Sequence, residues 1–137
     1  MYRCIVLAVC LAAGVSVPVS GHAQDKQTIH FTVTDQGLVT NDISIKDKRF
    51  TLPQGVRVRF VFEHQDRNGN AHQFTVHSSE AEYKARAISP DGPKTAVLEF
   101  TVGDRGEPFY RISCDLPCIA MDQLTDYLLF VDRSKQS

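Results

Sequence analysis

Short segments in which apolar and polar side chains alternate restrict the folds that this chain can adopt. The clearest is 56–62, Val-Arg-Val-Arg-Phe-Val-Phe, whose β-branched and aromatic residues suit a pleated strand. The same kind of strand signal, bounded by turn residues, recurs at 29–33, 43–45, 50–52, 72–77, 95–102, 109–114 and 127–131. Segment 78–88 fits either a short helix or a meandering loop, and 127–131 reads as a largely buried strand. Strands of this length and spacing predict an all-β Greek-key sandwich.

Size and charge exclude several classes of protein. With 137 residues the chain has room for one domain, which is too short for a Rossmann or barrel enzyme. Its formal net charge is −1, and no basic stripe is available to neutralise the phosphates of a nucleic acid. No hydrolase constellation and no phosphate-cradling loop is evident, so we expect a protein that is not an enzyme.

The first 23 residues are typical of an export signal. Arg3 precedes a short apolar run, and the small residues Gly21 and Ala23 fit a cleavage site before Gln24. The run is too short to span a bilayer comfortably, which argues against an uncleaved anchor. We therefore expect a signal peptide at 1–23, a mature domain at 24–137, no membrane insertion after cleavage, and a periplasmic location. Only Cys114 and Cys118 would then remain of the four cysteines.

One segment concentrates the residues that bind soft metals. A predicted strand delivers Cys114 into a short loop that also contains Cys118 and Met121, before the last strand returns the chain. Far upstream, His72 opens another predicted strand. Thiolate, thioether and imidazole donors together select copper over magnesium or calcium.

In these residues the chain resembles the cupredoxins, small β-sandwich proteins of the blue-copper type. The resemblance covers nearly all of the mature chain in strand pattern, and it matches at motif level only near His72 and from Cys114 to Met121. It implies that His72 is the upstream imidazole ligand, Cys114 the thiolate and Met121 the weak axial thioether. Cys118 stands where the family places its second histidine. The Cys-x3-Cys spacing also resembles the dinuclear copper loop of cytochrome oxidase subunit II, although this chain lacks the histidine that follows there.

Three chemical interpretations of the loop remain open. One copper ion could be bound by His72, Cys114, Cys118 and Met121. Alternatively, Cys114 and Cys118 could form a structural disulfide, as an oxidising compartment favours. The pair could also switch between a dithiol metal site and a disulfide.

Other histidines and carboxylates are weaker candidate ligands. His64 lies at the far end of the loop before His72 and is a reserve ligand. His30 and His77 are expected to be solvated, and Asp115 and Asp122 to be surface charges.

The predicted function is that of an exported, copper-binding, cupredoxin-like protein. Its role would be electron transfer or copper handling, with a redox or copper-exchange protein as its partner. One alternative is a metal-free interaction module stapled by Cys114 and Cys118. Another is an accessory component of a periplasmic metal-uptake system. The sequence does not indicate an oligomeric state.

Overall fold

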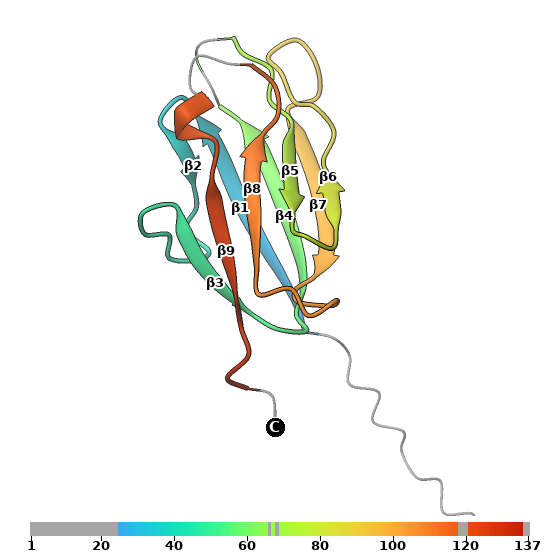
Figure 1. Ribbon diagram of the computed structural model, residues 1–137. Helices are drawn as coiled ribbons and strands as arrows, with labels where there is room; N and C mark the ends of the chain where they lie inside the picture. The colour runs from blue at the N-terminus through green and yellow to red at the C-terminus, as the bar shows by residue number, and fades with distance from the viewer. Residues whose placement is uncertain (1–24, 66, 68, 118–120, 136–137) are drawn as a thin grey trace, which may run out of the picture.

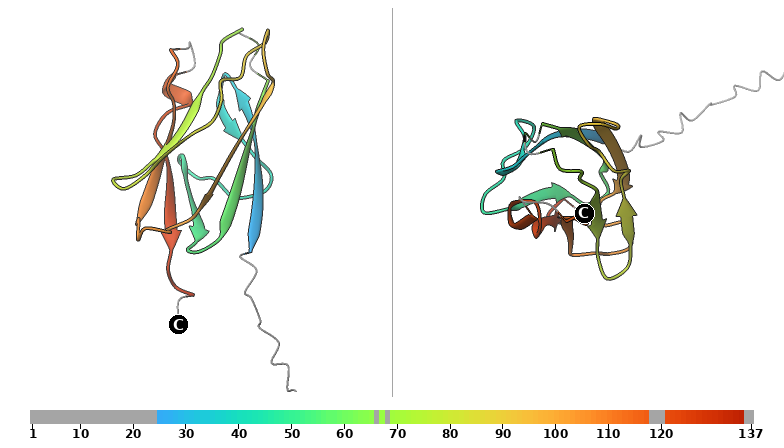
Figure 2. Two further views of the ribbon diagram at one scale, coloured as in Figure 1. Left: turned by 90° about the vertical axis from the view of Figure 1, so that its right-hand side faces the viewer. Right: turned by 90° about the horizontal axis from the view of Figure 1, so that it is seen from above.

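Two β-sheets stacked face to face form the domain (Figure 1), as the side and top views in Figure 2 show. The computed structural model describes residues 25–65, 67, 69–117 and 121–135. The first sheet has the order β2 (Gly37–Val39), β1 (Lys26–Thr34), β4 (Arg57–His64), β7 (Thr95–Thr101). The second has the order β3 (Arg49–Pro53), β9 (Tyr127–Asp132), β8 (Phe109–Cys114), β5 (Phe74–His77), β6 (Glu82–Lys84). A short 3₁₀ turn, η1 (Met121–Gln123), precedes β9. The predicted signal peptide lies outside the described residues, none of which belongs to a helix long and apolar enough to cross a membrane.

Neighbouring strands in each sheet are mostly distant in sequence. β1 runs parallel to β4, and β3 runs parallel to β9, whereas the other pairs are antiparallel. Parallel neighbours cannot be joined by a tight hairpin, so the chain crosses between the sheets. The result is the all-β sandwich that the strand spacing predicts.

The structure differs from two local expectations and decides between two alternatives at a third place. Residues 43–45 form no strand, although Ile43 and Ile45 still pack against the core. Segment 78–88 is the meandering loop rather than the helix, and it contains the short strand β6. The strand expected to start at His72 starts at Phe74, and His72 instead makes an isolated bridge to Ile88. Alternation shows which side chains face the core, but it does not show whether the backbone finds a partner strand.

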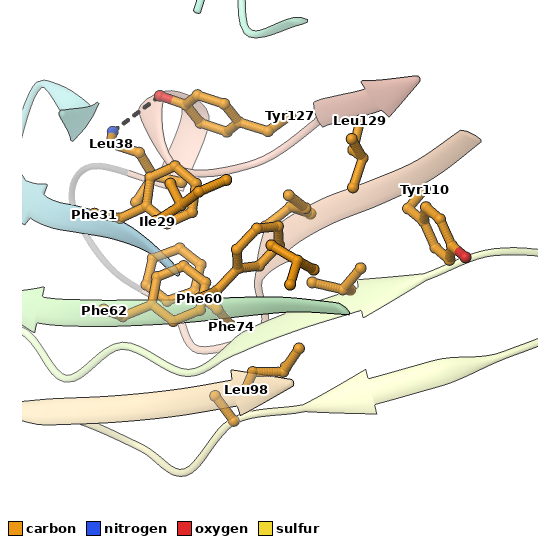
Figure 3. Close-up of a cluster of buried hydrophobic side chains, with 14 of the residues drawn as sticks. Ile29, Phe31, Leu38, Phe60, Phe62, Phe74, Leu98, Tyr110, Tyr127 and Leu129 are labelled. Carbon is orange, nitrogen blue, oxygen red and sulfur yellow. Dashed lines mark hydrogen bonds between the residues drawn. The ribbon is translucent and has the colours of Figure 1, made fainter. Parts of the chain in front are cut away.

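Phenylalanine rings from both sheets fill the space between them (Figure 3). Phe62 is fully buried and stacks on Phe74, with ring centroids 4.5 Å apart and planes 6° apart. It also stacks on Phe31, with ring centroids 5.4 Å apart. The expectation of a largely buried last strand holds only for its inward side, because Phe130 is 38% exposed and lies beside exposed Phe109.

Tyr127 fixes the short strand β2 to the start of β9. Its hydroxyl accepts a hydrogen bond from the Leu38 backbone N–H at 2.9 Å (Figure 3). Gly37 approaches so closely that a Cβ there would lie 2.6 Å from the same oxygen, and its φ of +128° also favours glycine. This contact secures the chain just after η1.

A buried carboxylate closes the opposite end of the sandwich. Glu107 accepts hydrogen bonds from the Tyr110 hydroxyl at 2.8 Å and the Arg105 backbone N–H at 2.6 Å. Burial raises the pKa of Glu107, but these hydrogen bonds outweigh it and hold the pKa below its ordinary value. Burial and the neighbouring carboxylate raise the pKa of Tyr110.

The free energy of unfolding is therefore expected to fall in acid. A folded-state pKa below the unfolded value of about 4.5 means that ionised Glu107 stabilises the fold above that pH. This contribution is lost as the pH falls through the lowered pKa. Replacing Glu107 by glutamine should flatten the acid limb of a urea-midpoint profile between pH 6 and 3, by about 1 kcal/mol. The exposed Glu80→Gln variant is the control, and an unchanged acid limb in Glu107→Gln would contradict the prediction.

Candidate metal centre

His72 and Cys114 meet at the end of the sandwich that also carries η1 (top in Figure 1). Cys114 ends β8 and pairs with Phe74 of β5, two residues after His72. The His72 backbone exchanges two hydrogen bonds of 2.8 Å with Ile88, and the Cys114 amide donates to the Leu124 carbonyl at 2.9 Å. Backbone hydrogen bonds thus fix the positions of both residues, independently of their side-chain contacts.

The two side chains contact one another inside the protein. The Cys114 Sγ lies 3.7 Å from the His72 Nδ1, and also 3.6 Å from the Leu116 carbonyl oxygen. His72 is fully buried, and Cys114 is a buried free cysteine. The structure therefore brings together the two residues that the sequence nominated as thiolate and imidazole.

His64, the reserve ligand, lies next to this pair. Its ring centroid is 5.4 Å from that of His72, and its side chain is largely buried at the end of β4. The His64 Nε2 lies 2.7 Å from the Asn70 backbone oxygen, which can only accept a hydrogen bond. The Nε2 therefore carries a proton, and a neutral His64 ring has its lone pair on Nδ1.

The other predicted ligands are not placed by the described residues. Cys118 lies outside them, and of Met121 only the backbone is described, at the start of η1. Within the described part of the chain, no three His, Cys, Asp or Glu side chains are grouped closely enough to hold a metal ion. His30 is exposed and pairs with Asp42, and His77 is half-buried on β5.

Asp115, expected to be a plain surface charge, is tied to its neighbours. Its backbone N–H donates to the Gln73 carbonyl at 2.8 Å, next to His72. Its carboxylate accepts a hydrogen bond from the Thr75 hydroxyl and lies 3.6 Å from the Lys84 ammonium. The sequence does not indicate these contacts. They join Asp115, the residue after Cys114, to the strand segment that follows His72 and to β6.

The geometry of the pair fits a shared metal ion. Metal–thiolate and metal–imidazole bonds of about 2.3 and 2.0 Å, meeting at an angle near 120°, separate sulfur from nitrogen by about 3.7 Å. The observed 3.7 Å needs little rearrangement to meet this requirement. A thiol that donates to the imidazole gives a similar separation, so the pair is equally suited to a metal-free hydrogen bond.

Solved structures with a similar fold include a "blue" copper protein and a chain of a heme-copper oxidase. The chain matches a chain of a heme-copper terminal oxidase dimer with a TM-score of 0.56 and 12% identity, over 82% of this chain and 68% of the other. It matches auracyanin A of Chloroflexus aurantiacus, a "blue" copper protein, with a TM-score of 0.52 and 14% identity, over 78% and 99%. Reduced rusticyanin gives a TM-score of 0.52 and 14% identity, over 84% and 87%.

These likenesses show the fold, a two-sheet β-sandwich of cupredoxin type. No protein-family model matches the chain, and no curated protein matches it.

Proposed function

We propose that this protein is an exported copper-binding protein that transfers electrons to or from a protein partner. The observation that carries the proposal is the buried His72–Cys114 pair at one end of a cupredoxin-type sandwich. Cys118 and Met121, from the loop that follows Cys114, complete the proposed ligand set. Copper, when bound, would supply a one-electron couple.

The contribution of the protein is to hold the donors still. His72 is fixed through Ile88, and Cys114 through Phe74 and Leu124, so neither donor has to move far between oxidation states. Burial excludes water from both side chains. Together with the outer hydrogen bonds, it would tune the reduction potential of a bound copper ion. A second cysteine as ligand would favour Cu(I) relative to a site with two histidines.

The test is copper stoichiometry combined with optical absorption. The chain from Gln24 onward is reduced, loaded with copper without oxygen, desalted and then oxidised, with a count of free thiols alongside. We expect about one retained copper ion per chain and an absorption band from thiolate-to-copper charge transfer. Retained copper that stays colourless and reduced would favour copper carriage instead. No retained copper, with the thiols closing to a stable disulfide, would overturn the proposal in favour of the stapled interaction module.

A further inference from the structure

A tight turn between residues 46 and 49 adopts a conformation that its residues do not favour. Lys46 and Arg49 exchange backbone hydrogen bonds of 3.0 and 2.9 Å, which leaves Asp47 and Lys48 as a two-residue hairpin loop. Both have positive φ, 51° and 60°. Such loops normally carry Asn-Gly or Asp-Gly, because a lysine with its Cβ is disfavoured in the left-handed region. The geometry of the turn therefore does not explain why a lysine stands at position 48.

The side chain of Lys48 has a role of its own, because it reaches η1 and the residues between η1 and β9. Its ammonium donates to the Asp122 carbonyl at 2.5 Å and to the Thr125 carbonyl at 3.0 Å. It also lies 5.6 Å from the centre of the Tyr127 ring. Lysine commonly satisfies the carbonyls at the end of a helical turn in this way.

The segment that Lys48 holds also supports the end of β8. Leu124, between the two bound carbonyls, is fully buried, and its own carbonyl accepts the Cys114 amide at 2.9 Å. One residue after Thr125, the Asp126 amide donates to the Ser113 hydroxyl at 3.2 Å. Segment 122–126 is thus hydrogen-bonded both to the Lys48 ammonium and to the end of β8, through the Ser113 hydroxyl and the Cys114 backbone amide.

We propose that Lys48 is a positioning residue for the metal centre. It clamps segment 122–125, and through Leu124 that segment fixes the backbone of Cys114. The effect on copper rests on the proposed function, whereas the effect on the backbone does not.

The test in metal-free protein is amide hydrogen exchange. Lys48→Met keeps the aliphatic chain but removes the ammonium, and it should speed exchange of the Cys114 and Asp126 amides about 10-fold. Exchange in the central strand β4 should stay unchanged. Lys48→Arg, which keeps a cation, should restore most of the protection. Asp47→Gly is the matched control, because it relieves the same turn and leaves the ammonium in place.

The second readout is copper retention. Lys48→Met should still bind about one copper ion but lose it to a competing chelator about 10-fold faster than the wild type and Asp47→Gly. If wild-type protein binds no copper, the proposed function fails while the exchange result still judges the clamp. Unchanged exchange at Cys114 and Asp126 in Lys48→Met overturns the proposal. So does a uniform loss of protection that includes β4, because Lys48 would then act on global stability alone.

Discussion

Replacing His72 by alanine is expected to reduce retained copper from about one ion per chain to near zero. The imidazole is one of the two donors that the structure brings together, with its Nδ1 3.7 Å from the Cys114 Sγ. Loss of an outer-shell partner costs metal affinity about 10- to 100-fold, so loss of a direct ligand should cost more than about 100-fold. Competition with a chelator, and loss of the charge-transfer band, would measure the effect.

The matched control for His72→Ala is His77→Ala. His77 is half-buried on β5, five residues further along the chain. Its replacement by alanine should leave copper binding unchanged. Thermal unfolding of both variants separates loss of the site from loss of the fold, because the alanine at position 72 empties a fully buried position. Full copper retention by a folded His72→Ala protein would rule out His72 as a ligand.

Replacing Phe62 by alanine is expected to lower the free energy of unfolding by about 3–5 kcal/mol. The ring is fully buried, stacks on Phe74 from the opposite sheet, and also stacks on Phe31 from the neighbouring strand β1. Alanine would remove these contacts and leave a cavity between the two sheets. Chemical denaturation of the wild type and the variant would measure the change.

Phe109→Ala is the control for this second prediction. It removes the same side chain from a position that is 45% exposed, where the ring contacts Phe130 on the surface of the sandwich. We expect the free energy of unfolding to fall by about 1 kcal/mol or less, because much of this ring is already in contact with water in the folded protein. Equal losses in Phe62→Ala and Phe109→Ala would show that stacking between the sheets does not dominate the stability of the core.

The inward faces of the long strands were predictable from the sequence, because burial imposes a two-residue period on them. Ile29, Phe31 and Val33 are all fully buried, as their alternation indicates. β2 was not predictable, because its three residues are too few to show a period and depend on the Tyr127 hydroxyl for support.

For the site, residue type and order were enough to predict His72 and Cys114 as candidate metal ligands. The fold places these two side chains side by side. The contacts around them could not be read in advance. Lys48 and Thr75 are far in sequence from the residues they bind, and neither is of a type that marks a metal centre. Whether Cys118 and Met121 act as ligands stays a prediction.

The parallel pairing of β3 with β9 has a consequence for the order of folding. β9 lies between β3 and β8, so β3 has no other neighbour in its sheet until the last strand arrives. Contacts between residues so distant in sequence form late and slowly. The Leu124 carbonyl that receives the Cys114 amide lies just before β9, so it too is placed only when the chain is nearly complete. We therefore expect the Cys114 amide to become protected from hydrogen exchange only when β9 docks, among the last steps of folding.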